Sequence, residues 1–189
     1  MNTKKNTLQE IMDIGLQLVQ ERGYNGFSYA DIAEAIGIRK ASIHYHFPSK
    51  QDLVQAVLIR YRKEFVEKLE QIKNQPHSWL QRLQLFFGLY RETLENNSKL
   101  CLCSMMAAEL NSFPEEIREE LNLFFHANKN WVEYVLEQGK KAGDFTFSLS
   151  AAEQARILVA FVQGAQLLSR STGDIGYYDT LVTNYMASL

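Results

Sequence analysis

The sequence of 189 residues lacks the long apolar runs and the cysteine pairs that define several large protein classes. It contains no stretch of about eighteen consecutive apolar residues, and its amino terminus passes directly into an amphipathic segment, so neither a membrane span nor a signal core is expected. Its two cysteines, Cys101 and Cys103, are too few for a disulfide framework and are typical of a reducing compartment. We therefore expect a soluble, cytoplasmic protein that does not associate with a membrane.

The motifs of the common enzyme classes are also missing. The sequence contains no HExxH, no phosphate-binding glycine loop and no GxSxG. The cysteines have neither a second cysteine pair nor a histidine at ligand spacing nearby, which disfavours a zinc site. We expect a protein that is not an enzyme and that requires no cofactor and no metal.

Residues 27–47, FSYADIAEAIGIRKASIHYHF, are the most informative stretch of the sequence. Ser28, with Asp31 three residues later, has the pattern of a capping box at the start of a helix. Gly37 stands where a helix end favours a left-handed residue, and a second helix can begin near Lys40. Two short helices joined by a tight turn predict a helix-turn-helix.

The second of these helices has one face for packing and one for hydrogen bonding or stacking. The net charge of the chain is only −2, but residues 39–50 contain three basic residues and no acidic one, which suits a phosphate-lined groove. The alternative is an aromatic-rich solvent face on a helical adaptor that does not bind DNA. The residues predicted to contact DNA are Ser28, Tyr29, Lys40, Ala41, Ser42, His44, Tyr45, His46 and Lys50.

This region closely resembles the amino-terminal DNA-binding domain of the TetR family. The matching segments are Gly23-Tyr24, Phe27-Ser28, Ile32-Ala33, Gly37-Ile38, Ile43-His44-Tyr45-His46-Phe47 and Ser49-Lys50-Gln51-Asp52-Leu53. His44 replaces a tyrosine that members of the family use to contact a backbone phosphate. The resemblance implies a homodimeric transcriptional repressor that binds a double-stranded DNA operator and is released by a small-molecule effector.

Apolar periodicity predicts an all-α fold of about nine helices, with three in a DNA-binding head and the rest in a larger body. We expect a domain boundary between residues 1–48, the head, and residues 49–189, the body for effector binding and dimerisation. The other helices are expected over residues 5–22, 49–73, 79–94, 100–110 and 176–186, and the helix over 49–73 would link head to body. Two more are expected after caps at Ser112 and Ser150, and the first of these runs to about residue 143.

Aromatic and thioether side chains gather on the helices predicted between residues 79 and 143. Such residues line binding cavities, but they also form ordinary cores. The predicted effector pocket consists of Phe86, Phe87, Tyr90, Met105, Met106, Phe124, His126, Trp131, Tyr134 and Gln163, with Asn128 as a further polar candidate.

The helix that follows Ser150 is apolar around much of its circumference, so it is either paired with another subunit or buried within its own. Pairing with the last helix across a two-fold axis would form a four-helix interface. The residues predicted at this interface are Leu158, Val162, Gly164, Ala165, Leu168, Tyr178, Leu181, Val182 and Tyr185.

Cys101 and Cys103 leave one further alternative open, a regulator that senses oxidants or electrophiles. They lie at the predicted start of the helix over 100–110, where the helix dipole favours a reactive thiolate. The simpler interpretation is two small buried residues, because positions two apart lie on different faces of a helix.

Overall fold

The structure is a computed structural model that describes the backbone of residues 3–189 and the side chains from residue 7 onward. The described chain folds into nine α-helices and one 3₁₀ turn, with no strand, which confirms the all-α prediction. Contacts divide it into two compact units: the first comprises residues 1–63 and 102–122, and the second residues 64–101 and 123–189. The first unit is larger than the expected head of residues 1–48, because it also includes the first part of the helix over residues 50–74 and the segment 102–122.

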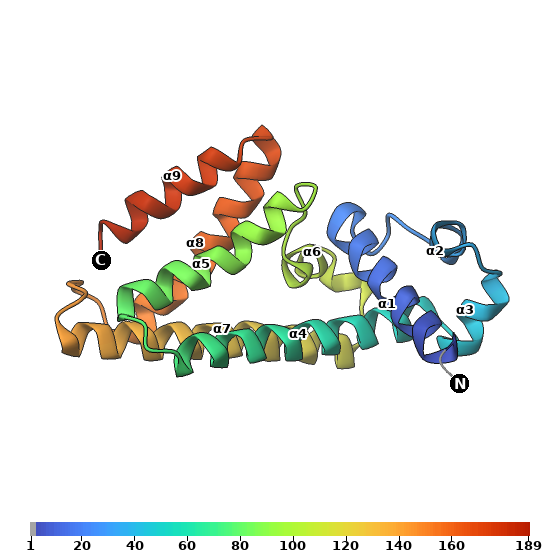
Figure 1. Cartoon of the computed structure of the whole chain (residues 1–189), viewed down its shortest axis with the longest axis horizontal. Helices are drawn as coiled ribbons and strands as arrows, with labels where there is room; N and C mark the ends of the chain where they lie inside the picture. The colour runs from blue at the N-terminus through green and yellow to red at the C-terminus, as the bar shows by residue number, and fades with distance from the viewer. Residues whose placement is uncertain (1–2) are drawn as a thin grey trace. The chain divides into compact units, whose positions relative to one another are not determined.

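The first unit contains the predicted three-helix head (Figure 1). Its helices are α1 (Thr3–Arg22), α2 (Tyr29–Ile36), α3 (Lys40–His46), the first part of α4 (Lys50–Asn74), α6 (Leu102–Ala108), the 3₁₀ turn η1 (Leu110–Ser112) and the first part of α7 (Glu115–Ala142).

The helix boundaries in the head follow the local signals in the sequence. Ser28 and Asp31 form both bonds of the predicted capping box at α2, and Gly37 ends this helix with φ of 68°. The Ser49 hydroxyl accepts from the Asp52 amide, and the Asp52 carboxylate in return accepts from the Ser49 amide. Each such cap contributes about 1 kcal/mol to helix stability, and the two caps fix where α2 and α4 begin.

The core of the first unit is built from one apolar side chain or more on each helix of the head. Ile11, Val19, Ile32, Ile43 and Leu53 are completely buried. Burying a side chain of this size contributes about 1.5–3 kcal/mol relative to leaving it in water. Ile43 is the one fully buried residue of α3, so the remaining face of this short helix is available to a partner.

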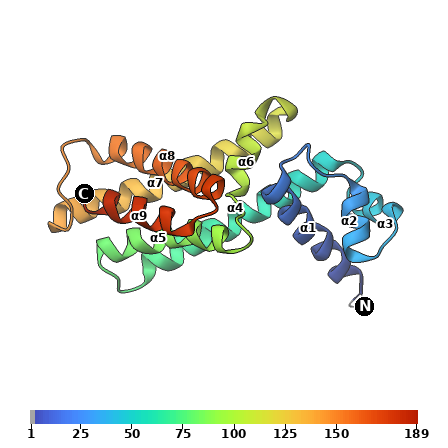
Figure 2. The same ribbon diagram turned by 90° about the horizontal axis from the view of Figure 1, so that it is seen from above.

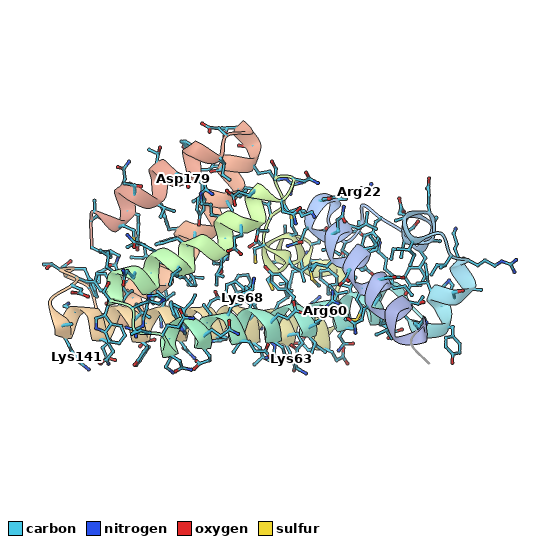
Figure 3. All side chains as sticks on the ribbon, viewed as in Figure 1. Arg22, Arg60, Lys63, Lys68, Lys141 and Asp179 are labelled. Carbon is cyan, nitrogen blue, oxygen red and sulfur yellow. The ribbon has the colours of Figure 1, made fainter. Side chains whose placement is uncertain are left out.

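The second unit contains α5 (Trp79–Glu95), α8 (Ala151–Thr172), α9 (Ile175–Met186) and the remaining parts of α4 and α7. Helices α5, α8 and α9 lie side by side (Figure 2). The Tyr178 hydroxyl of α9 donates to the Phe87 carbonyl of α5 at 2.8 Å. On the surface of the same pair of helices, the Arg91 guanidinium bonds both oxygens of the Asp179 carboxylate, which is labelled in Figure 3.

Two helix boundaries differ from the predictions. Helix α6 is shorter than the expected span of residues 100–110, and the chain then tightens into η1. Ser112 lies in η1 and does not cap the next helix, since α7 begins only at Glu115, after Pro114. Within residues 3–189, none of the helices is long and apolar enough to cross a membrane.

Candidate functional site

The outward face of α3 carries most of the residues predicted to contact DNA. Lys40, Ala41, Ser42, His44 and Tyr45 are exposed, and 72% of the Tyr45 surface is accessible. An exposed tyrosine beside a lysine and a serine offers one stacking surface and several hydrogen-bond donors. The helix therefore presents groups that can contact base edges and phosphates in a major groove.

Tyr29 and Lys50 are directed into the head, which differs from the prediction. Burial raises the pKa of Tyr29 to about 12, with a further contribution from the charge of Asp52. The Tyr29 hydroxyl bonds the Phe47 carbonyl at 2.9 Å. The Lys50 ammonium donates to the Phe27 carbonyl and lies over the Phe27 ring. Both side chains therefore hold the ends of α3 and α4 in place, and neither geometry is that of a DNA contact.

His44 has one ring nitrogen engaged within the head. Its Nδ1 lies 3.1 Å from the Pro48 carbonyl oxygen, so this nitrogen carries the proton when the bond forms. The neutral ring then offers only an acceptor at Nε2. His44 can donate a second hydrogen bond, to a phosphate, only as the doubly protonated imidazolium.

In the second unit, Tyr90 joins polar side chains from two other helices. Its hydroxyl donates to Asn128 Oδ1 at 2.9 Å and accepts from Gln163 Nε2 at 3.2 Å. Asn128 is completely buried, and its Nδ2 donates to the Phe124 carbonyl at 2.9 Å. The structure thus brings together three of the polar groups that the sequence suggested for an effector site.

Aromatic rings surround this polar group. Phe65 contacts the rings of both Tyr90 and Phe124, with centroids 5.6 and 5.1 Å apart. Phe86 stacks on Trp131 with centroids 5.6 Å apart. The site is uncharged and largely aromatic, and its polar side chains bond one another and neighbouring backbone carbonyls. We name Phe65, Phe86, Tyr90, Phe124, Asn128, Trp131 and Gln163 the Tyr90 cluster.

A groove of about 320 Å³ lies between α4 and α7, beside the Tyr90 cluster. Trp131 belongs to both, since it lines the groove and stacks on Phe86. Its Nε1 donates to the Leu69 carbonyl at 2.9 Å. At the rim, the Lys73 ammonium lies 5.0 Å from the centre of the Tyr134 ring. The Lys73 ammonium also lies 3.5 Å from the Glu70 carboxylate, which lines the same groove. The groove therefore combines an aromatic wall with one ion pair.

Other residues predicted for the effector pocket lie elsewhere. Met105 and Met106 belong to the first unit, because α6 packs with the head. His126 is exposed on α7. Phe87 contacts the Phe161 and Tyr185 rings on the α8 and α9 side. The spacing of these residues along their helices predicted that they are packed against other helices. It did not predict which helix each of them contacts.

Comparison with known proteins agrees with this geometry at both ends of the chain. Residues 11–57 match the family described as "Bacterial regulatory proteins, tetR family", and residues 80–185 match the family described as "Tetracyclin repressor-like, C-terminal domain". The HTH-type transcriptional repressor DhaR of Mycobacterium sp. strain GP1 is 30% identical over 84% of this chain and 80% of its own. The chain belongs to the TetR family.

Two solved structures agree with this assignment. A TetR-family transcriptional regulator from Agrobacterium tumefaciens has a TM-score of 0.94 and 30% identity, with 98% of each chain covered. The regulator FadR from Bacillus subtilis, solved with stearoyl-CoA, has a TM-score of 0.73 at 16% identity over 96% of this chain and 98% of that one, and so shares the fold. The present chain is a DNA-binding transcriptional regulator and not an enzyme.

The apolar residues of α8 in this TetR-family chain divide between two faces. Leu158, Val162 and Ala165, which were predicted at a dimer interface, are buried in the second unit, as is Tyr178 of α9. Leu181, Val182 and Tyr185 are half-buried. These four residues are therefore buried within their own subunit. A helix that is apolar around much of its circumference does not show from its sequence which face turns inward.

The opposite face of α8 carries an apolar stripe that sequence reasoning mostly missed. Ile157, Leu167 and Leu168 are 47, 57 and 49% exposed, although all three are large and apolar. Ala160 is exposed between them, and a Cβ added at Gly164 would meet nothing within 4 Å. We name Ile157, Ala160, Gly164, Leu167 and Leu168 the α8 stripe.

Both cysteines are completely buried. The Cys101 amide donates to Gln166 Oε1 at 3.2 Å, and Gln166 Nε2 donates to the Tyr90 carbonyl at 2.7 Å. Thiols that lie inside the protein are not in the exposed environment of reactive cysteines, so the structure favours the simpler interpretation.

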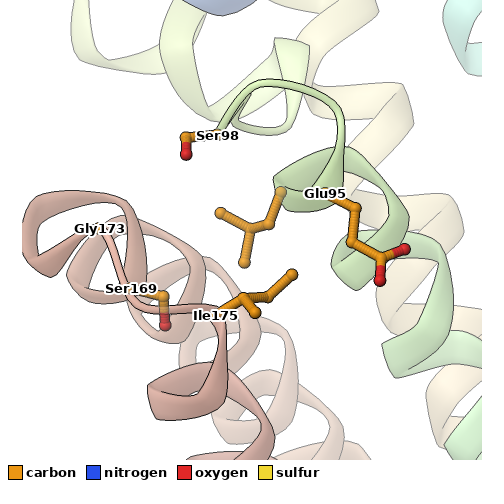
Figure 4. Close-up of a pocket in the computed structure, with 6 residues that line it drawn as sticks. Glu95, Ser98, Ser169, Gly173 and Ile175 are labelled. Atoms are coloured by element: carbon orange, nitrogen blue, oxygen red, sulfur yellow. The ribbon is translucent and has the colours of Figure 1, made fainter.

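A second groove, of about 360 Å³, lies where α5 and α8 end and α9 begins (Figure 4). Leu94 and Ile175 give it an apolar lining, and Ser98, Ser169 and Glu95 add polar groups. It combines residues from distant parts of the sequence, which is why no local pattern predicted it.

Proposed function

We propose that this TetR-family regulator is a dimeric repressor whose two α3 helices enter successive major grooves of a near-palindromic operator, about 34–36 Å apart. The observation that carries the proposal is the exposed face of α3, which presents Lys40, Ser42, His44 and Tyr45 with no acidic side chain among them. His46, which is half-buried, stands at the end of the same helix. Ser28 is exposed at the start of α2, where its hydroxyl caps that helix.

The α8 stripe supports the dimer. Contiguous exposed apolar side chains on a monomer mark a protein–protein contact, because their exposure to water is unfavourable. The spacing of Ile157, Gly164 and Leu168 places them along one side of the helix. Gly164 allows the backbone of a second copy to approach closely, and two-fold packing would make the stripe complementary to itself.

The Tyr90 cluster and the adjoining groove support a small-molecule effector site. Ligand sites combine an apolar, aromatic wall with a few placed polar groups, and this region of the second unit has both. An effector that binds better to the protein in its DNA-free state would lower operator occupancy. A coupling free energy of about 1–3 kcal/mol changes affinity by about 5- to 150-fold, which is enough for regulation.

The proposal is tested by selection of genomic or randomised duplexes on the purified protein, followed by a salt titration of the retained sequence. We expect a near-palindromic site, a dimer in sedimentation, and an affinity that falls steeply as salt concentration rises. A protein that remains monomeric and retains no duplex at low ionic strength would instead be a helical adaptor.

A further inference from the structure

The turn between α1 and α2 is held by a carboxylate that is far away in the sequence. Glu109, just after α6, accepts the Tyr24 amide through Oε1 at 2.7 Å and the Asn25 amide through Oε2 at 3.1 Å. The Asn25 side-chain amide also donates to this carboxylate. Hydrogen bonds to an ionised acceptor are about twice as strong as neutral ones. A single side chain thus holds residues 23–27, which we name the 23–27 turn.

The backbone of the turn is shaped to receive this carboxylate. Gly23 has φ of 78°, a conformation that residues with a Cβ rarely adopt. A Cβ at Gly23 would lie 2.3 Å from Glu109 Oε1, so any larger residue would displace the carboxylate. The requirement for glycine here therefore comes both from the left-handed backbone and from the approach of Glu109.

Further contacts come from the segment after Glu109 and from α4. Asn25 Nδ2 donates to Ser112 Oγ at 3.2 Å, and the Tyr24 ring meets the buried Phe113 ring at 4.8 Å. On the α4 side, the Lys50 ammonium lies 4.5 Å from the centre of the Tyr24 ring. Burial lowers the pKa of Lys50, and the negative charge of Glu109 acts in the opposite direction.

The 23–27 turn leads directly into the DNA-binding helices. Ser28, the cap of α2, is the next residue, and α2 begins at Tyr29. Helix α3 packs on α2 and is tied to it through the hydroxyl of Tyr29. A shift of the turn would therefore move α2, and α3 with it, as one piece.

We propose that Glu109 is a positioning residue for DNA binding, whose carboxylate fixes the 23–27 turn and thereby the orientation of the α2–α3 pair against α6. This inference rests on the proposed function. The position of Glu109 suits such a role, because it directly follows the last residue of α6, and α6 packs on α1 within the first unit.

The test compares Glu109→Ala and Glu109→Gln with Glu119→Gln in the full-length protein. Glu119 is exposed on α7 in the same unit, so its variant controls for the loss of one negative charge. The affinity for the selected operator and for a randomised duplex is measured by fluorescence anisotropy, with sedimentation and thermal unfolding as structural readouts.

We expect Glu109→Ala to weaken operator binding by about tenfold, within the usual range for coupled sites, while binding to the randomised duplex and the dimer stay unchanged. Glu109→Gln should lose less, since its amide oxygen still accepts one backbone N–H. Glu119→Gln should match the wild type. Without DNA, hydrogen exchange at the Tyr24 and Asn25 amides should accelerate in Glu109→Ala.

Gly23→Ala gives an independent arm. In the wild-type background this substitution should weaken operator binding, because it displaces the Glu109 carboxylate. In the Glu109→Ala background the carboxylate is absent, so the same substitution should weaken binding less. Equal effects in the two backgrounds would contradict the contact between Gly23 and Glu109.

Two results would overturn the positioning role. One is Glu109→Ala binding the operator like the wild type, and the other is an equal loss of operator and random-duplex affinity together with a lower unfolding temperature. If the wild type itself retains no duplex, the proposed function fails and the positioning role fails with it. Amide exchange then shows only whether the carboxylate holds the turn.

Discussion

Helices α3 and α8 present two exposed surfaces of opposite chemistry. The face of α3 is polar and aromatic, with Lys40, Ser42 and Tyr45 in solvent. The α8 stripe is apolar, with Leu167 and Leu168 about half exposed. A surface that offers hydrogen-bond donors suits nucleic acid, whereas an apolar one suits another protein surface. The difference matches the proposed function, in which the face of α3 binds DNA and the α8 stripe binds a second copy.

The two helices also differ in how firmly they are anchored. Helix α3 has one buried residue, Ile43, whereas α8 has seven. A short helix with little burial depends on its neighbours for its orientation, as we propose for α3 with Tyr29 and the 23–27 turn. A long, well-buried helix can carry an interface without such support.

The largest effect is expected from a charge placed in the α8 stripe. Ile157→Glu with Leu167→Glu would bury four carboxylates in the dimer, two from each subunit, which is strongly unfavourable. We expect a monomer in sedimentation and an operator affinity lower by about 100-fold, since each half-site is then bound alone. Leu123→Glu, at an equally exposed leucine of α7, is the control and should remain dimeric. If the double variant remained dimeric, the α8 stripe would not be the dimer interface.

A smaller loss is expected from Tyr45→Ala on the other surface. Removing a side chain that contacts the groove should weaken operator binding by about ten- to 100-fold, in line with about 1–3 kcal/mol for a specific contact. The dimer should stay intact, because Tyr45 lies in the first unit, on the exposed face of α3. Tyr177→Ala, at an exposed tyrosine of the second unit, should bind the operator normally. Anisotropy with sedimentation checks both, and unchanged affinity for Tyr45→Ala would contradict the docking of α3.

A several-fold gain in operator affinity is expected from His44→Tyr. Because Nδ1 of His44 faces the Pro48 carbonyl, the neutral ring has no second N–H to donate to a phosphate. A tyrosine hydroxyl at this position can donate one hydrogen bond, which contributes about 0.5–1.5 kcal/mol. His44→Phe, which has no such donor, is the control and should not bind more tightly than the wild type. Anisotropy with the selected operator checks both, and equal affinities of His44→Tyr and the wild type would show that this position does not contact a phosphate.

The smallest effect is expected from Tyr29, whose hydroxyl bonds the end of α3, and it concerns the stability of the fold at high pH. Burial raises the pKa of Tyr29 to about 12, whereas a tyrosine in the unfolded chain ionises near pH 10. The neutral hydroxyl therefore stabilises the fold fully below about pH 10, and this contribution is lost as pH rises towards 12. Tyr29→Phe should be less stable at neutral pH but lose less stability between pH 10 and 12. Unfolding temperatures of both proteins across this range give the comparison.

The sequence predicted those parts of the structure that local signals determine. The capping box at Ser28 and the left-handed end at Gly37 act within one helical turn, so they were visible without the fold. The number of helices followed from apolar periodicity for the same reason. The short α6 was not predicted, because nothing in its own seven residues marks the tightening into η1.

The direction in which individual side chains point was harder to predict. Tyr29 and Lys50 sit in a DNA-binding motif, yet they bond to carbonyls of the head that are near only in the folded chain. Glu109 drew no attention in the sequence, because its partners are about eighty residues away. The face that α8 buries depends on the packing of α5 and α9 against it, which periodicity does not encode.

The grouping of residues 102–122 with the head has a practical consequence for engineering. A fragment that ends at residue 63 would lack Glu109, Ser112 and Phe113, and its 23–27 turn would lose the acceptors of its backbone amides. Chimeras that exchange recognition specificity between relatives should therefore transplant two separate pieces of chain. If only the amino-terminal piece were transplanted, its 23–27 turn would have to bond whatever side chain the recipient carries at the position of Glu109.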